Sequence, residues 1–472
     1  MRPTDPGSPL PFISGKSLRK GNVMHQYRKS LGAAAVALAT TAALGLSGAP
    51  AQADPAPQEK DVVATGSDII QNSFNFLADG YKQLPGYNTA GNRWRFINFD
   101  SSGDAQGRSA FTDPRLLPTI TGNGTLGENG AKYVKQSDVK LLNPTIALRA
   151  GQDLVVRPSG GGGGGRDAII ADDQGWIDVG RSPDPLDKVE NGPDYQQLAF
   201  AKQGTKLLRV QIATDRQLIA TATTTNAPAT IPASAILSIY AGNITKWGQI
   251  PGYQGPGQAI NTAAPTYTGP EADETIVALI LPTDAGMWNT FVANVKRQNP
   301  GNTGFTGRGN PNSVQVQQND PVSITSLPEA QRKNAIVPFP RGRFRTLNTG
   351  YYTQTSDGAK TNNYNTETGH RTPASAAGIK LLDGDSNADV NQPTAPYGGN
   401  FAYNAIVRER DLNSTTPWQP GSTLNWVEAL FYNPDGPAPF VRTPAGQALL
   451  TAAGVTPQYR VFGTDNAEIS VD

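Results

Sequence analysis

Hydrophobic positions recur along the chain in two patterns, short apolar runs typical of strands and three- and four-residue spacings typical of helices. Residues 62–81 contain both: an apolar run, a turn, and then Ile70, Phe74 and Leu77 on one helical face, with Ser67 at the N-cap position. Further strands are predicted at 93–100, 206–223 and 335–344, and further helices at 166–175, 230–247, 424–432 and 443–455. Residues 274–295 are predicted as a strand, a loop and a helix. Residues 101–140 are predicted as loops, and 357–400 as a long polar excursion or hairpin.

Strands that alternate with helices predict an α/β fold with a largely parallel sheet. In such sheets, ligands lie beyond the carboxyl ends of the strands and against helix N-termini. The predicted pattern therefore indicates where to look for a site, namely the loops between a strand and the helix that follows it.

Composition narrows the possible functions. The chain has 472 residues, of which 37% are hydrophobic and 17% charged, so two or three domains or one large bilobed unit are expected. A net charge of +1 gives no electrostatic case for nucleic acid. There is no cysteine, and beyond His25 the only histidine is His370, in a polar stretch. We therefore expect no cofactor, no metal site and no Ser-His-Asp triad.

The N-terminal region has the three parts of a secretory signal peptide. Basic Arg28 and Lys29 precede an Ala-rich apolar stretch at 31–46, and Ala51-Gln52-Ala53 has the small-residue form of a cleavage site. Residues 1–53 are thus predicted to be removed after Ala53, with export and without a lipid anchor. The apolar stretch is short for a membrane anchor, and the true start, Met1 or Met24, is left open.

Three loops share the order strand, small polar loop, helix start: residues 64–68, 157–167 and 282–288. The first backbone N–H groups of a helix lack internal partners and carry partial positive charge, so converging helix starts bind anions without lysine. Each loop taken singly is also typical of an ordinary connection. The six glycines 160–165 are consistent with a flexible tether, but their neighbours favour a loop whose backbone approaches a ligand.

A fourth feature is Arg181-Ser182 at the end of a predicted strand. An arginine there can direct a fork of donors at an oxyanion, or pair with a nearby aspartate on the surface. The residues alone leave these two readings open.

The order of these motifs resembles the phosphate-binding proteins of ABC importers and their secreted relatives. The resemblance extends from about 62 to 463 through "GSDIIQNSFNFLADGY", "VVRPSGGGGGGRDAI", "IDVGRSPDPL", "IYAGNITKWGQI", "PTDAGMWNTFVANV" and "PAGQALLTAAGVTP". It implies a two-lobed, hinged periplasmic-binding-protein-like fold with the ligand between the lobes. Lobe 1 is expected to be discontinuous, from 62–215 and 346–472, and lobe 2 to be 216–345.

Carried over residue by residue, the resemblance implies a set of ligand-binding positions. They are Gly66, Ser67, Asp68, Ser159, Gly160, Gly161, Arg181, Ser182, Asp284 and Gly286. Two departures concern the ligand. Pro183 replaces an expected aspartate, with Asp184 one residue later, and Ala285 and Met287 replace expected hydroxyls beside the added acid Asp284.

The function expected from this resemblance is a secreted solute-binding protein for phosphate or a similar oxyanion, working as a monomer, with the membrane component of an ABC importer as a candidate partner. The alternative is an envelope-associated interaction protein that keeps the fold without transport. A secreted hydrolase is disfavoured because no spacing singles out a carboxylate pair among the Asp and Glu residues.

Overall fold

The structure is a computed structural model. It describes residues 58–81, 83–88, 94–99, 148–149, 164–186, 194–281, 286–316, 318–319, 321–348, 378–382 and 392–471, and four two-residue strands between 125 and 156. The predicted signal peptide and most of the two polar stretches at 101–140 and 357–400 lie outside these residues.

Within the described residues, thirteen strands form one mixed sheet, whose main path runs β2-β1-β7-β13-β8-β11-β9-β10-β4-β3. The strands are β1 (Val62–Gly66), β2 (Phe96–Asn98), β3 (Thr125–Leu126), β4 (Lys132–Tyr133), β7 (Val179–Ser182), β8 (Leu207–Ala222), β9 (Val277–Ile280), β10 (Val314–Gln315), β11 (Ala335–Pro340), β12 (Ile379–Leu381), β13 (Gly399–Arg408), β14 (Thr456–Phe462) and β15 (Glu468–Ile469). A separate pair joins β5 (Thr145–Ile146) to β6 (Val155–Val156).

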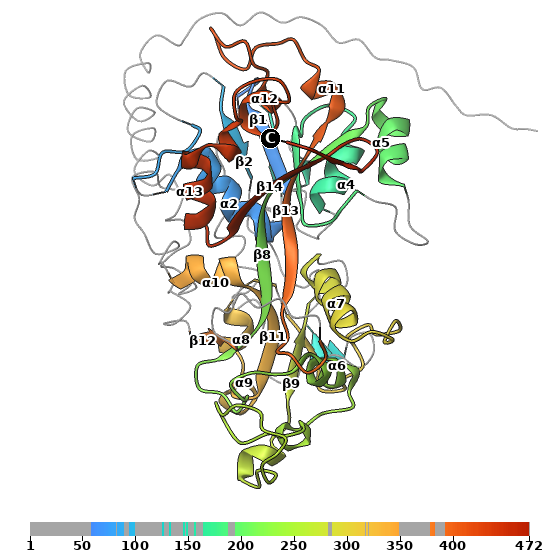
Figure 1. Ribbon diagram of the computed structural model, residues 1–472, viewed down its shortest axis with the longest axis vertical. Helices are drawn as coiled ribbons and strands as arrows, with labels where there is room; N and C mark the ends of the chain where they lie inside the picture. The colour runs from blue at the N-terminus through green and yellow to red at the C-terminus, as the bar shows by residue number, and fades with distance from the viewer. Residues whose placement is uncertain are drawn as a thin grey trace, which may run out of the picture. The chain divides into compact units, whose positions relative to one another are not determined.

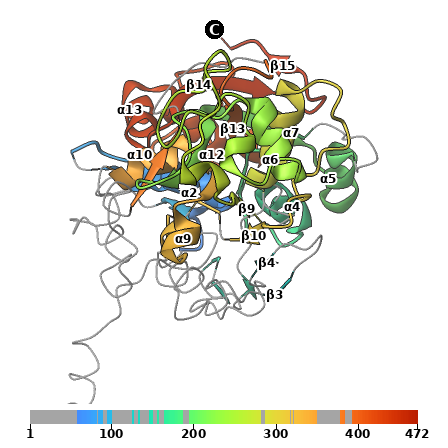
Figure 2. The same cartoon turned by 90° about the horizontal axis from the view of Figure 1, so that it is seen from below.

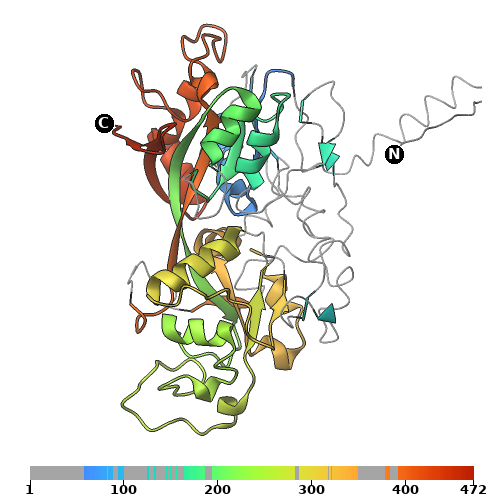
Figure 3. The ribbon, with the colours of Figure 1, turned by 90° about the vertical axis from the view of Figure 1, so that its right-hand side faces the viewer.

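The long strand β8 connects two groups of strands. Its first part pairs with β14, its last part pairs with β11 and β12, and β13 runs antiparallel beside it (Figure 1). In Figure 3 the same two strands, green and orange-red, are seen side by side. Nearly every residue of β8 is buried, since neighbouring strands or packed side chains cover it. We call the elements on the β1–β7 side the first half, and those on the β9–β11 side the second half.

Helices follow the strands in both halves. They are α2 (Asp68–Asp79), α4 (Gly164–Ala171), α5 (Tyr195–Gln203), α6 (Ala233–Ala241), α7 (Gly286–Gln298), α8 (Val322–Thr325), α9 (Glu329–Arg332), α10 (Arg341–Asn348), α11 (Glu409–Leu412), α12 (Trp426–Leu430) and α13 (Pro444–Ala452). In the first half α13 packs on α2 and α5 on α4, and in the second half α6 packs on α7 (Figure 2).

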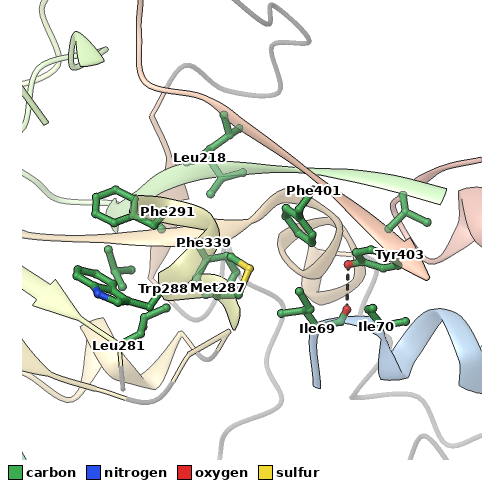
Figure 4. Packing of buried hydrophobic residues seen from close by; sticks show 14 of the residues in the cluster. Ile69, Ile70, Leu218, Leu281, Met287, Trp288, Phe291, Phe339, Phe401 and Tyr403 are labelled. Atoms are coloured by element: carbon green, nitrogen blue, oxygen red, sulfur yellow. Dashed lines mark hydrogen bonds between the residues drawn. The ribbon is translucent and has the colours of Figure 1, made fainter. Parts of the chain in front are cut away.

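One hydrophobic cluster runs through both halves. In the first half it contains Ile70 of α2 beside Phe401 and Tyr403 of β13, and in the second half it contains Met287 and Phe291 of α7 (Figure 4). A smaller cluster lies under α4 and α5. The apolar helix positions predicted from sequence are therefore core positions.

The predicted elements are mostly confirmed, with three corrections. The sheet is parallel among β1, β2 and β7 and among β9, β10 and β11, but the central strands β8 and β13 are antiparallel to their neighbours. Short strands β3 and β4 occur in the region predicted as loops. The strand predicted at 335–344 ends at Pro340, where α10 begins, because the Asp215 carboxylate accepts the Gly342 N–H at the helix start.

Candidate functional site

The first predicted loop lies where β1 ends and α2 begins. Gly66 has φ +118°, a conformation that side chains disfavour, and a Cβ there would overlap the backbone of Gly165. Ser67 occupies the predicted N-cap position, but its side chain makes no capping hydrogen bond to α2, and its N–H donates to the Arg181 carbonyl at 3.0 Å. The Ser67 side chain therefore does not cap the first backbone N–H groups of α2. An anion-binding role for this helix start needs those groups not to be capped by the serine.

The last glycine of the run explains part of the polyglycine sequence. A Cβ on Gly165 would overlap the backbone of Arg181, and one on Gly180 would overlap the Gly165 carbonyl. Gly66 and Arg181 are themselves paired across β1 and β7. The starts of α2 and α4 are thus brought together at the carboxyl ends of these strands, by backbone contacts that only glycine permits.

Arg181 lies under this junction and is fully buried. Its guanidinium donates to the carbonyls of Gly66 at 2.9 Å, Ser67 at 3.3 Å and Phe99 at 2.8 Å, and also to the Asn98 side chain. Of the two readings left open by the sequence, a surface ion pair is wrong because the side chain is not on the surface. Arg181 holds the backbone of the predicted ligand loop, and its direct contact with an anion stays a prediction.

Ser182 is also buried, and its hydroxyl accepts the Asp184 N–H at 3.0 Å. Burial raises the pKa of Asp184, and Arg166 on α4, 3.8 Å away, acts in the opposite direction. Arg166 also stacks on the Tyr195 ring, with 3.6 Å from the guanidinium carbon to the ring centroid. Asp184, considered from sequence as a substitute for the missing aspartate, is thus held beside α4.

Asp68, the first residue of α2, makes a contact that sequence reasoning missed. Its two carboxylate oxygens accept hydrogen bonds from Gln318 at 2.5 Å and Asn319 at 3.0 Å, both from the segment after β10. Asn319 has φ +62°, and its carbonyl accepts from Arg343 at 3.0 Å. A buried contact therefore joins the predicted ligand loop of the first half to the second half.

A faint signal for these partners exists in the sequence. "VQVQQND" alternates like a strand and then becomes continuously polar, which is the pattern of a strand end carrying side-chain chemistry. None of the motifs that carry the family resemblance includes Gln318 or Asn319, so the sequence alone gives these two residues no role.

In the second half, Gly286 begins α7 and is buried. Met287 is 1% exposed and belongs to the core (Figure 4), and its carbonyl accepts the Gln217 side-chain amide at 2.8 Å. The residue that replaces an expected hydroxyl is therefore a packing residue. Ser159, Gly160, Gly161 and Asp284 lie outside the described residues.

No group of three histidine, cysteine or acidic side chains in the described part of the chain is arranged to hold a metal ion. No helix among the same residues has both the length and the apolar character needed to cross a membrane.

Comparison with known proteins gives the family. Residues 138–389, just over half of the chain, match the family model described as PBP superfamily domain. The chain belongs to the PBP superfamily, which confirms the family and the two-lobed α/β fold class predicted from the motifs. No curated protein sequence matches the chain.

Solved structures are similar at low identity. One is a putative phosphate ABC transporter substrate-binding protein with bound phosphate from Clostridium perfringens (12% identity, 84% of this chain, 99% of that chain, TM-score 0.39). Others are a possible phosphate binding protein from Planctomyces limnophilus (12%, 85% and 93%, 0.33) and PstS from Borrelia burgdorferi (12%, 84% and 99%, 0.33). Because these TM-scores are below 0.5, the assignment rests on the family model.

Proposed function

We propose that the protein is a secreted solute-binding protein that captures phosphate or a similar oxyanion between its two lobes. The observation that carries the proposal is the junction at Gly66, Gly165 and Arg181, which brings the N-termini of α2 and α4 together. The first backbone N–H groups of helices and the helix dipoles favour an anion at such a point. The family match supports a binding role, and the order of motifs from 62 to 463 supports phosphate as the ligand class.

The proposed lobes are 62–215 with 346–472, and 216–345. The change of partners along β8 supports a division near Asp215, since β14 pairs with it as far as Thr214 and β11 from Gln217 onward. Two short strands depart from the proposed bounds: β12, within 346–472, pairs with the last part of β8, and β4, within 62–215, pairs with β10. The second strand across the proposed hinge is β13, which pairs with β8 on both sides of this point.

Asp68 limits which oxyanion fits. A carboxylate beside the first turn of α2 repels a fully ionised ligand most strongly, and it repels a ligand that keeps a proton less, because such a ligand carries less negative charge. Met287 stands where the resemblance implies a hydroxyl, and its buried thioether side chain supplies no donor to offset that repulsion. We therefore propose a protonated oxyanion, such as hydrogen phosphate, bound mainly by backbone amides.

The remaining parts of the proposal rest on the sequence. The signal-like residues 24–53 support export and release by cleavage after Ala53, and the family supports a binding role rather than catalysis. An ABC importer component is the proposed partner, with the protein acting as a monomer.

One observation favours the alternative, an envelope-associated interaction protein without transport. Asp68 already has protein donors on both oxygens, an arrangement that needs no ligand. Retention of a specific envelope component by the chain, together with no heat of phosphate binding, would support this alternative over the first proposal.

Calorimetric titration of residues 54–472 with phosphate tests the main proposal, with sulfate as the comparison anion. We expect saturable heat with phosphate, weaker heat with sulfate, and an increase in melting temperature with phosphate. Gly66→Ala should abolish the heat, because its Cβ would displace the α4 start. Gly304→Ala, at an exposed position with open space around it, should leave the heat unchanged. A folded wild-type chain that gives neither heat nor a thermal shift contradicts the proposal.

A further inference from the structure

The place where β8 changes partners is two residues long. β14 pairs with β8 through Thr214 and β11 from Gln217, so Asp215 and Arg216 have neither strand beside them. Among the strands that the structure describes, β13 alone pairs with these two residues, through Phe401 and Asn400. Bending between the halves is therefore expected to concentrate at Asp215 and Arg216, where β8 has passed β14 and has not yet reached β11.

The Asp215 side chain is enclosed at this point, with 1% of its surface exposed. The Gly342 N–H lies 3.0 Å from both carboxylate oxygens, at the start of α10. The N–H of Arg216 donates to Oδ1 at 2.7 Å, and the Tyr403 hydroxyl lies 3.2 Å from Oδ2. One carboxyl group thus connects β8, β13 and the first turn of α10.

Tyr403 extends this connection to the other half of the molecule. Its hydroxyl also lies 2.9 Å from the carbonyl of Ile69 in α2 (Figure 4). A hydroxyl has one proton, so it cannot donate to both acceptors at once. With an ionised Asp215 the proton is drawn to the carboxylate. A neutral Asp215 can instead donate to the Tyr403 oxygen, which frees the hydroxyl proton for Ile69.

Charged groups act on this connection from each element packed around it. Arg341 on α10 favours the ionised Asp215, as do the N–H donors of Arg216 and Gly342. At Tyr403, Asp68 of α2 and Arg343 of α10 act in opposite directions. Burial outweighs the favourable contacts and raises the pKa of Asp215 to about 6.

We propose that Asp215 is a protonation-dependent lock at the hinge: its neutral carboxyl group stabilises the arrangement in which α2, β13 and α10 meet, and its ionisation destabilises that arrangement. The sign follows from proton linkage. The packed state binds the proton more tightly than an open or unfolded state, so its extra stability is present at low pH and is lost as the pH rises through about 6. This inference concerns the conformational equilibrium and does not depend on which anion is bound.

A distance measurement between the halves tests the lock. Because the chain has no cysteine, Lys202→Cys on α5 and Ala293→Cys on α7 can be spin-labelled selectively, and both residues are exposed. We expect the label-to-label distance distribution to change with pH, with a midpoint near the pKa of Asp215, about 6. Asp215→Asn should keep the low-pH distribution throughout, because its amide oxygen can accept from Gly342 and its NH₂ can donate to Tyr403.

Two further variants make the test specific. Burial also raises the pKa of Asp411 to about 6, but this residue lies on α11 beside Arg408, so Asp411→Asn should keep the distance transition.

Tyr403→Phe removes a donor to the Asp215 carboxylate and should move the midpoint of the distance transition to higher pH. A wild-type label-to-label distance distribution that does not change with pH overturns the proposal. A pH transition that persists in Asp215→Asn also overturns it. If Asp215→Asn does not fold, an unchanged midpoint in Tyr403→Phe overturns it and an upward shift supports it.

Discussion

The strand ends of the two halves are built differently. At the ends of β1 and β7, the backbone of these strands contacts the backbone at the start of α4. Gly66, Gly165 and Gly180 allow these contacts, which any side chain would prevent. In the second half, side chains fill the corresponding places, with Met287 in the core and Gln318 and Asn319 on the Asp68 carboxylate. The first region offers amide donors that depend little on side-chain identity. The contacts of the second region depend instead on particular side chains.

The largest expected effect tests the backbone region. Gly165→Ala places a Cβ against the backbone of Arg181, which cannot move without separating α4 from β7. We expect a loss of about 3 kcal/mol or more in the free energy of unfolding, measured by urea denaturation, and loss of anion binding.

The control is Gly304→Ala, since Gly304 has no neighbouring atom within 4 Å of an added Cβ and no positive φ. It should change the free energy of unfolding by less than about 0.5 kcal/mol. Equal effects of the two substitutions would mean that close backbone approach is not what the glycine run provides.

The next effect concerns the buried arginine below that region. Arg181→Lys leaves several of its four acceptors without a donor, and we expect a destabilisation of about 2–3 kcal/mol together with weaker phosphate binding. Arg408 is a matched control in the same half, buried and bonded to Asp172 and to the Ile177 carbonyl. Arg408→Lys should cost similar stability and leave the calorimetric affinity unchanged. If both variants lose affinity equally, Arg181 has only a general structural role.

The sequence predicted the first region well, because its determinants are local. Ser67 at a helix start and the glycines before α4 are visible as strand–loop–helix patterns. The burial of Arg181 was not predictable, since the four acceptors that the described residues supply to it come from segments about 80 to 115 residues away. Sequence periodicity reports neighbours along an element and contains no information about such distant partners.

The second region was predicted less well for the same reason. Asp68 and Gln318 are 250 residues apart, and α10 replaces the end of a predicted strand only because Asp215 reaches its first turn. The departure at Met287 was visible, but its explanation as a core residue required the fold. Local pattern therefore located the helix starts, whereas tertiary contacts determined what faces them.

Asp68 provides the third test, because stability and affinity should change in opposite directions. Asp68→Asn places an NH₂ group against one of its two amide donors, and we expect a loss of about 1–2 kcal/mol in unfolding free energy. Removing the negative charge beside the α2 N-terminus should strengthen oxyanion binding by about tenfold, measured by calorimetry.

Asp79 lies at the other end of the same helix and is exposed, which makes Asp79→Asn the matched control. It should leave the affinity for phosphate unchanged. A weaker affinity in Asp68→Asn would instead identify the carboxylate as a ligand contact, consistent with an anion that donates a proton to it.

The smallest expected effect distinguishes the contribution of the Asn319 backbone conformation to stability from that of its side-chain hydrogen bond. With φ +62°, Asn319→Ala carries a conformational cost of about 1 kcal/mol that Asn319→Gly avoids, although both lose the hydrogen bond to Asp68. Asn466, with φ +63°, should show the same Ala–Gly difference without any change in phosphate affinity. If the two Asn319 variants have equal stability, the positive φ stores no strain. If both bind phosphate as the wild type does, the contact between the halves at Asp68 is independent of the ligand, and the specificity of the second region lies elsewhere.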